Sequence, residues 1–483
     1  MVYLITNSEK YYADLCDEIR LFYNERNIPM TDSVPLEGTV LKHVLRYEDG
    51  KIINTSVLYE DGDMRCSRTV VLPDGEFTEL ERTRAEKHGA KNSIYMVLAD
   101  HTGIRRPWGS LTGVRPSKMY RDLVRNLGAA EADRRMREEY FLSEEKLSLL
   151  KQIYEVQEPF IDSNEPGRDI DIYVGIPFCT SRCSYCSFFS LLASKDGGKE
   201  HSYVDALIRE IDASADMLEK RNIRSLYMGG GTPTALSDSE LERVLCHLDR
   251  YVRGREFTVE AGRPDTITES KLALLKDHNV ARISINPQST CERTLGLIGR
   301  SHSISQFYSA VEMALGMGFD SINMDLIAGL QDEDTEIFMN SLKECMAFGP
   351  QNITVHTLAI KKGSRYGMED FKGYTDEAIV SEMISGAREL LSEKGYIPYY
   401  LYKQKYMAGN LENVGYCMKG KECIYNIDMM EDEADVVAFG LGTSSRRIFN
   451  DEGKIKRFYT PKDLSLYISD MDGIIEKRKE LFA

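Results

Sequence analysis

The stretch Ile176-Pro-Phe-Cys-Thr-Ser-Arg-Cys-Ser-Tyr-Cys-Ser-Phe188 directly follows an apolar run, residues 170–176, that predicts a buried β-strand. Its three cysteines, Cys179, Cys183 and Cys186, have the spacing C-x₃-C-x₂-C. Three thiolates can bind three irons of a cubane iron–sulfur cluster and leave the fourth iron open, whereas a cluster that only transfers electrons usually has four cysteines. Tetrahedral zinc also prefers four ligands, and no second cysteine pair stands nearby at zinc-finger spacing. The loop therefore predicts an open-site iron–sulfur cluster, with zinc and unligated cysteines as the alternatives.

The composition is that of a globular protein with reduced thiols. The 483 residues are 42% hydrophobic and 29% charged, enough for roughly two to four domains. The ten cysteines are mostly isolated, as expected in a reducing compartment. The N-terminus lacks a signal-peptide pattern, and no stretch approaches the roughly 18 apolar residues of a membrane span. We expect a cytoplasmic protein, and its net charge of −16 argues against nucleic acid as its main partner.

The first part of the chain, residues 1–165, is expected to be an α/β accessory domain. Three Asp-Gly pairs, at 49–50, 61–62 and 74–75, separate segments rich in β-branched residues. Asp-Gly between such segments is a strong hairpin signal, so we predict a small antiparallel meander. Helical patterns follow, and loop-type residues at 161–168 mark the first domain boundary.

The middle of the chain, residues 166–365, alternates between strand and helix patterns, which predicts a parallel sheet. We expect strands at 171–176, 224–229, 256–261, 281–286, 320–327 and 352–358. The fold class is therefore α/β, with a partial parallel (β/α)₆ barrel at its centre. In such barrels the chemistry lies at the carboxyl ends of the strands.

The last part, residues 366–483, is expected to form a C-terminal α+β domain that is mostly helical. It has patterns for a long helix near 375–394, short strands at 397–402 and 435–439, a hairpin across 450–453 and a terminal helix over 461–480.

A glycine run, Gly229-Gly-Gly-Thr-Pro-Thr234, follows the second predicted strand. Consecutive glycines let a ligand approach the backbone and expose N–H and C=O groups to it. The run lacks both the Lys-Ser/Thr ending of a phosphate loop and the G-x-G-x-x-G of a dinucleotide turn. It favours a ligand held by bare backbone rather than by phosphate contacts, with a simple strand-to-helix turn as the alternative.

Polar residues at the ends of the following strands form a second candidate group. Glu260, Gln288 and Asp325 stand on successive strands, and Arg300 comes shortly after Gln288. Charged residues at strand ends of a barrel need partners or a ligand. Arg300 could bind a carboxylate, and Glu260 or Asp325 could bind an ammonium or a ribose hydroxyl. The group predicts a site for a zwitterionic nucleoside, with a structural salt-bridge network as the alternative.

The cysteine triplet after the first strand and the glycine run after the second resemble the radical S-adenosylmethionine (SAM) superfamily. Within it, the chain resembles the oxygen-independent coproporphyrinogen III oxidase family, and most specifically its longer coproporphyrinogen dehydrogenase type with an extra N-terminal domain. The likeness rests on Tyr173-Val-Gly-Ile-Pro-Phe-Cys179, Tyr227-Met-Gly-Gly-Gly-Thr-Pro-Thr234, Phe257-Thr-Val-Glu260, Arg282-Ile-Ser-Ile-Asn-Pro-Gln288, Asn323-Met-Asp-Leu-Ile-Ala-Gly-Leu330, and the segments 107–116 and 399–413.

This resemblance implies one [4Fe-4S] cluster bound by the three cysteines, with SAM on the open iron. It implies that the methionyl amine meets Gly230, Gly231, Thr232 and Glu260, that its carboxylate pairs with Arg300, that Gln288 and Asp325 bind ribose or nearby groups, that Ile327 packs near adenine, and that Phe178 and Phe188 flank the cluster. Tyr173 would approach the sulfonium or the substrate and is the candidate catalytic residue.

The resemblance also implies an activity: oxidative decarboxylation of coproporphyrinogen III to protoporphyrinogen IX by a 5′-deoxyadenosyl radical, in haem biosynthesis. The implied partners are the tetrapyrrole substrate and a flavodoxin- or ferredoxin-like electron donor, and a monomer is compatible with the sequence.

Two departures from the family pattern keep other activities open. The oxidases read Tyr-x-His where this chain has Tyr173-Val-Gly175, and they carry a further cysteine where this chain has Phe188. Phenylalanine at that position resembles the related haem-chaperone branch. The alternatives are therefore a haem-binding or haem-delivery protein, and another tetrapyrrole-modifying radical SAM enzyme.

Overall fold

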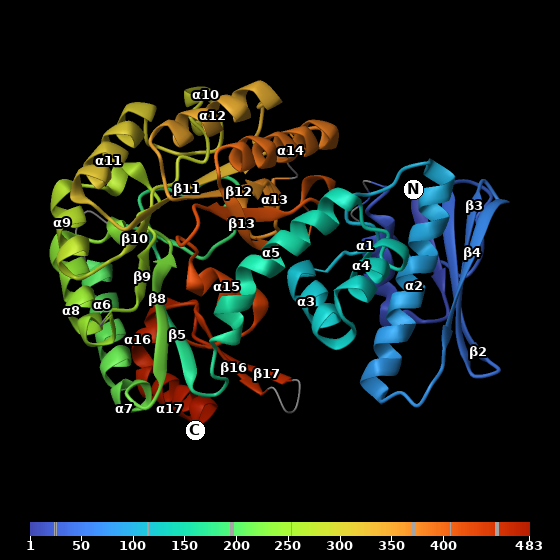
Figure 1. Cartoon of the computed structure of the whole chain (residues 1–483), viewed down its shortest axis with the longest axis horizontal. Helices are drawn as coiled ribbons and strands as arrows, with labels where there is room; N and C mark the ends of the chain where they lie inside the picture. Colours follow the sequence, from blue (N-terminus) through green and yellow to red (C-terminus); the bar gives the residue numbers. More distant parts are fainter. Residues whose placement is uncertain are drawn as a thin grey trace. The chain divides into compact units, whose positions relative to one another are not determined.

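The computed structural model describes residues 1–483 apart from 24, 26, 114, 194–197, 253, 370–372, 374, 406 and 450–453. The chain forms two compact units, Met1–Lys151 and Gln152–Ala483 (Figure 1). The division falls inside helix α5 (Glu144–Asp162), close to the boundary expected near 165. The boundary expected near 365 does not separate compact units, because the segments on its two sides share one sheet.

The first unit contains a four-stranded sheet in the order β1-β2-β3-β4. Its strands are β1 (Val2–Thr6), β2 (Thr39–Glu48), β3 (Lys51–Glu60) and β4 (Asp63–Pro73). β1 runs parallel to β2, and β2, β3 and β4 are antiparallel neighbours. The predicted meander is thus present. At both of its turns, 49–50 and 61–62, Asp and Gly have positive φ, as a two-residue type I′ turn requires.

The third Asp-Gly pair has a different place, since it leads from β4 towards helix α2 (Glu79–Thr102). That helix begins with a capping box, in which Thr78 and Glu81 satisfy each other's backbone N–H groups. Apolar residues of the sheet, of α2 and of α1 (Tyr12–Ile19) share one buried core. The remaining helices of this unit are η1 (Glu9–Tyr11), α3 (Pro116–Leu127) and α4 (Ala129–Glu138).

The second unit is built on an eleven-stranded sheet in the order β13-β14-β12-β11-β10-β9-β8-β5-β15-β16-β17. Six parallel strands at its centre follow one another in chain order and form the partial (β/α)₆ barrel. They are β5 (Asp169–Ile176), β8 (Asn222–Gly230), β9 (Glu256–Val259), β10 (Arg282–Ser284), β11 (Ser321–Ala328) and β12 (Asn352–Thr357). Each predicted strand of the middle segment overlaps one of them.

Helices connect these strands, and Figure 1 shows α6, α8, α9 and α11 along the outer side of β8, β9 and β10. The helices of this segment are α6 (Gly198–Asp212), α7 (Ala215–Leu218), η2 (Pro233–Ala235), α8 (Asp238–Val252), η3 (Pro264–Thr266), α9 (Glu269–Asp277), α10 (Glu292–Leu297), α11 (Ile304–Met317), α12 (Thr335–Ala347) and α13 (Arg365–Met368). The inner side of the sheet faces α15 (Ile424–Glu431), whose Tyr425 stacks on Tyr227 of β8 with ring centroids 4.4 Å apart.

The C-terminal segment extends the same sheet at both edges. β14 (Asn413–Cys417) pairs antiparallel with β12 and then with β13 (Ile397–Tyr402), while β15 (Asp435–Phe439) pairs parallel with β5. The remaining elements are η4 (Ala408–Asn410), β16 (Ser444–Phe449), β17 (Lys454–Tyr459), α14 (Glu377–Glu393), α16 (Leu464–Ser469) and α17 (Met471–Phe482).

The turn of the predicted hairpin, 450–453, lies outside the described residues, although β16 and β17 pair antiparallel on either side of it. The predicted terminal helix is two helices that meet at Asp470. Among the described residues, none of the helices has the length and apolar character needed to span a bilayer.

Candidate active site

A cavity of about 370 Å³ opens at the carboxyl ends of the parallel strands, within the range of roughly 300–1,000 Å³ typical of small-molecule sites. Its lining includes most of the residues singled out from the sequence: Cys179, Cys183, Cys186, Phe188, Gly230, Gly231, Thr232, Glu260, Gln288, Arg300, Asp325 and Ile327. Residues spread over about 150 positions of sequence meet here because the strands lie in chain order and end at one edge.

Two predicted residues, Tyr173 and Phe178, lie beside the cavity rather than in its lining. Tyr173 stacks on Tyr227, with ring centroids 6.3 Å apart. The Phe178 ring is fully buried against Tyr203 in an edge-to-face contact. Phe178 still contributes to the site, because its carbonyl oxygen accepts a hydrogen bond from the Thr232 N–H at 2.7 Å.

The cysteine loop is held in place by backbone hydrogen bonds. Cys179 ends the short strand β6 (Phe178–Cys179), which pairs with β7 (Leu191–Leu192) on the far side of the loop. The Ser184 N–H donates to the carbonyl of Ile298 at 2.9 Å, and the Ser184 carbonyl accepts from the Tyr366 N–H at 3.0 Å. The loop is therefore fixed by strand pairing at its ends and by two distant segments at its middle.

The thiols of this loop are free and partly shielded from solvent. Burial raises the pKa of Cys186 to about 11 and the pKa of Cys179 above its usual value. Cluster binding must therefore displace protons from these thiols. The described residues hold no group of three or more His, Cys, Asp or Glu side chains arranged around a single metal ion. A cubane cluster does not need such a group, because each thiolate binds its own iron, and the three-cysteine loop fits this donor set.

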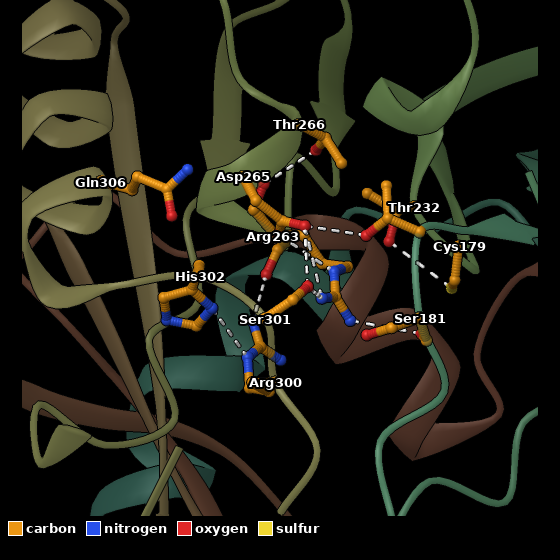
Figure 2. Close-up of polar contacts among 12 residues, drawn as sticks. Cys179, Ser181, Thr232, Arg263, Asp265, Thr266, Arg300, Ser301, His302 and Gln306 are labelled. Carbon is orange, nitrogen blue, oxygen red and sulfur yellow. Dashed lines mark hydrogen bonds and ion pairs between the residues drawn. The ribbon is translucent and has the colours of Figure 1, made fainter. Parts of the chain in front are cut away.

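The glycine turn is joined directly to the cysteine strand. The Gly231 N–H donates to the carbonyl of Ile176 at 2.7 Å. A Cβ on Gly231 would lie 2.6 Å from the Phe178 carbonyl oxygen, so only glycine permits this approach. The next residue, Thr232, places its hydroxyl 3.6 Å from the Cys179 sulfur (Figure 2). The turn thus fixes one wall of the cavity against the cysteine loop.

Glu260 is a carboxyl group that follows β9 and accepts a hydrogen bond from the Tyr227 hydroxyl at 2.7 Å. Burial raises its pKa to about 7, and the negative charge of Asp325 adds to the shift. A Cβ on Gly229 would lie 2.7 Å from the Glu260 carboxyl carbon, so the glycine leaves the space that this group occupies. No lysine or arginine among the described residues forms an ion pair with Glu260, which suits it to bind the ammonium of a ligand.

Gln288 stands beside Asp325 in a strained backbone conformation. Its φ is +67°, in the left-handed region, and its N–H donates to the Asp325 carbonyl at 3.0 Å. Its side-chain Oε1 is buried and has no hydrogen-bond partner in the described part of the chain. A buried amide oxygen of this kind normally has a partner, and strained residues concentrate at ligand sites.

Asp325 is held as a carboxylate. Burial alone would raise its pKa, but hydrogen bonding to His356 and Asn323 outweighs burial and keeps the pKa below the usual range. Asn323 Nδ2 donates to Asp325 at 2.8 Å, and His356 Nε2 lies 3.5 Å from the other oxygen. His356 also meets the Tyr402 hydroxyl at 3.3 Å. An acceptor is therefore fixed on the residue whose backbone carbonyl binds the Gln288 N–H.

Arg300 is a buried cation fixed by the backbone. One of its terminal nitrogens donates to the carbonyls of Gly262 at 2.8 Å and Asn286 at 2.6 Å. The other terminal nitrogen lies 3.4 Å from the Tyr185 hydroxyl. No carboxylate of the described residues forms an ion pair with it, so an anionic ligand group can neutralise its charge.

The residues that sequence reasoning missed are Arg263, Asp265, Tyr185, Tyr402 and Lys361. Arg263, Tyr185, Tyr402 and Lys361 line the cavity, and Asp265 binds Arg263 at 3.1 Å (Figure 2). One signal was available, since Arg263-Pro-Asp265 follows Glu260 at the end of a predicted strand. The whole arrangement suits a ligand with an ammonium, a carboxylate and ribose hydroxyls, bound next to three thiolates.

A family model described as the radical SAM superfamily matches residues 173–342. The chain is similar to the oxygen-independent coproporphyrinogen-III oxidase-like protein HemZ of Bacillus subtilis strain 168, with 34% identity over 470 residues, covering 95% of this chain and 93% of the relative. It is also similar to the heme chaperone HemW of Escherichia coli strain K12, with 28% identity over 295 residues, 60% of this chain and 72% of that protein.

Among solved structures, the chain is similar to HemN of Escherichia coli, described as a coproporphyrinogen III oxidase and a radical SAM enzyme. The TM-score is 0.53 with 21% identity, over 65% of this chain and 72% of that one. At this identity the likeness concerns the fold, which agrees with the partial barrel described above.

Proposed function

The chain belongs to the oxygen-independent coproporphyrinogen-III oxidase-like family of radical SAM proteins, and on that basis we propose that it converts coproporphyrinogen III to protoporphyrinogen IX. Proteins of this superfamily use a [4Fe-4S] cluster and SAM. The observation that carries the proposal is one cavity that joins three free cysteines to a buried carboxyl group and a buried guanidinium, neither with an ionic partner among the described residues.

We assign the cluster to Cys179, Cys183 and Cys186. We assign SAM to the wall next to them: Glu260 and the backbone at Gly230 and Thr232 would bind the amine, Arg300 the carboxylate, and Gln288 and Asp325 the ribose. The free Gln288 Oε1 supports this, because it needs a hydrogen-bond donor that the described residues do not supply. When bound, the cluster and SAM together would supply a 5′-deoxyadenosyl radical as the acceptor of a hydrogen atom from a substrate side chain.

The residues of the chain exclude water from this reaction and orient the reacting groups. Tyr227 lines the cavity and stacks with Tyr173 and Tyr425, with centroid distances between 4.4 and 6.3 Å. These packed rings back one wall of the cavity, and exclusion of water there would let a radical meet the substrate rather than solvent. In the proposed reaction each of two propionates would give a hydrogen atom to the 5′-deoxyadenosyl radical and one electron to a one-electron acceptor, and would release carbon dioxide to become a vinyl group.

The mouth of the cavity suits an amphipathic substrate with carboxylates. The Phe188 ring is 66% exposed there, and Lys361 lines the same cavity. A partly apolar wall with a cation beside it is complementary to a tetrapyrrole that carries propionates. The relatives whose names refer to coproporphyrinogen support the choice of tetrapyrrole.

The test is an anaerobic assay of reconstituted protein with coproporphyrinogen III, SAM and dithionite. It follows 5′-deoxyadenosine and tetrapyrrole products together. We expect both vinyl product and deoxyadenosine in wild type, and neither in Arg300→Ala at subsaturating SAM. Deoxyadenosine without a vinyl product would retain the radical chemistry and reject the substrate.

A second candidate function, haem binding for delivery, is favoured by Gly175. A Cβ there would lie 2.6 Å from Cγ2 of Thr443, and Thr443 is held by hydrogen bonds to Gly440 and Thr460. The position therefore has no room for the histidine that the oxidases carry. Stoichiometric haem binding, without turnover of coproporphyrinogen III, would select this function.

A further inference from the structure

Arg263 connects the SAM side of the cavity to the cysteine loop. It stands three residues after Glu260, at the start of η3, and is only 4% exposed. One terminal nitrogen lies 3.7 Å from the Cys183 sulfur. The same nitrogen lies 3.3 Å from the carbonyl oxygen of Ser181 (Figure 2). The guanidinium thus donates to a cysteine of the loop and to the backbone between two of them.

The position of Arg263 is fixed on its other side by Asp265 and Ser301. Asp265 lies 3.1 Å from Nε and 3.4 Å from the second terminal nitrogen, which also donates to the Ser301 hydroxyl at 2.7 Å. Asp265 also accepts from the Thr180 hydroxyl, inside the loop, at 2.8 Å. All the nitrogens of the guanidinium are therefore engaged, and the residues between Cys179 and Cys183 are held from both ends of the Arg263–Asp265 pair.

We propose that Arg263 is a positioning residue that raises the reduction potential of the iron–sulfur cluster through its contact with the Cys183 sulfur. The inference rests on the assignment of the three cysteines to the cluster. In this role Arg263 would act through the Cys183 sulfur and not through contact with SAM or the substrate.

The direction of the effect follows from charge. A thiolate ligand carries negative charge, and reduction of the cluster adds one more electron to the same group. Asp265 pairs with Nε and the second terminal nitrogen of the guanidinium, so the nitrogen that faces the sulfur is the positive end of this buried pair. It therefore stabilises the reduced state more than the oxidised state. Hydrogen bonds to the sulfurs, net charge and solvent exposure are the main influences on such potentials, and low solvent exposure limits screening of the charge.

The chain offers a matched control in Arg182, which lies next to Cys183 in sequence. Its guanidinium is exposed and donates to the carbonyl of Gly363 at 2.9 Å. Arg182→Gln therefore removes the same charge from the same loop without removing a sulfur contact. An exposed charge is screened by water and salt, so its loss should matter less.

The experiment measures midpoint potentials by EPR-monitored redox titration of reconstituted protein without SAM, together with iron content. Arg263→Gln should shift the potential to a more negative value than wild type, and by more than Arg182→Gln does. A potential equal to that of wild type, or a shift matched by Arg182→Gln, would overturn the proposal. Wild type that takes up no iron would instead refute the cluster assignment.

Arg263→Lys covers the case in which Arg263→Gln fails to take up iron. Lysine keeps the positive charge, but one ammonium cannot reach Asp265, Ser301 and Cys183 as the planar fork does. We expect iron uptake and a potential that is more negative than that of wild type. A wild-type potential in Arg263→Lys would also overturn the role of the sulfur contact.

Discussion

The two ends of the parallel strands in the second unit differ in how some of their buried charges are paired. At the amino ends, a foot cluster of Arg224, Asp428, Asp432 and Arg446 is paired internally. Arg224 donates to the two oxygens of Asp428 at 2.7 and 3.2 Å, and Arg446 binds Asp432 at 2.7 Å. At the carboxyl ends, Glu260 and Arg300 line one cavity and have no ionic partner among the described residues.

This difference separates charges that hold the fold together from charges that are available to a ligand. Removing one partner of a buried pair is expensive, because it leaves the other charge desolvated. A buried charge that has only neutral partners is already desolvated without a counter-charge, and a ligand of opposite charge stabilises it. We therefore expect changes in the foot cluster to affect stability, and changes around the cavity to affect binding and catalysis.

The largest expected effect is that of Cys183→Ala. It should remove one cluster ligand and abolish both iron–sulfur absorbance and SAM cleavage, while far-UV circular dichroism stays that of wild type. Cys246→Ala is the control, because Cys246 is exposed on α8 and outside the loop. Measurements of iron content, absorbance and deoxyadenosine check it, and SAM cleavage retained by Cys183→Ala would contradict the site.

Arg224→Ala tests the foot cluster. It leaves Asp428 buried without its cation, which should lower the free energy of unfolding by about 3–5 kcal/mol, with SAM cleavage per folded molecule unchanged. Arg168→Ala is the control, because its ion pair with Glu165 is on the surface at 2.9 Å, with both side chains more than half exposed. That pair should contribute less than about 1 kcal/mol. Chemical denaturation of both variants decides whether the foot cluster is structural.

Gln288→Gly should weaken SAM binding without lowering the stability of the fold. Glycine adopts the positive φ at lower cost, and the buried amide oxygen without a partner is removed, so the midpoint of unfolding should stay level or rise. The affinity for SAM should fall by about tenfold, the worth of roughly one hydrogen bond. Isothermal titration under anaerobic conditions measures it. Asn279→Gly, which relieves a φ of +59° outside the cavity, should leave the affinity unchanged.

Sequence patterns sufficed for the parts of the molecule that depend on local chemistry. The six central strands are apolar runs bounded by turn residues. Short helical connections place consecutive parallel strands side by side, which gives the observed chain order. The cysteine spacing and the glycine run also lie within single short segments. Strand order then brings Glu260, Gln288 and Asp325 to one edge without further information.

Other features depend on contacts between distant segments, which no spacing encodes. Arg263 contacts Ser181 and Ser301, which lie on loops far apart in sequence. The strands at 397–402 and 435–439 were expected, but β13 and β15 lie at opposite edges of the central sheet, and nothing local specifies the edge. The strained backbone of Gln288 and its free amide oxygen are likewise visible only in the folded chain.

The smallest expected effect is the pH dependence that Glu260 gives to both the stability of the fold and the affinity for SAM. Its pKa in the folded state is about 7 against a usual 4.5, raised by burial first and by Asp325 second. Since the folded pKa is the higher one, the stability linked to this group is present below pH 4.5 and is lost as the pH rises through about 7. Binding should follow the opposite course, because only the carboxylate attracts the ammonium of SAM. We expect SAM affinity to fall by up to about tenfold over one pH unit below this pKa, and Glu260→Gln to remove that dependence. Titrations of both proteins across this range check it, and identical profiles would mean that Glu260 does not face the amine.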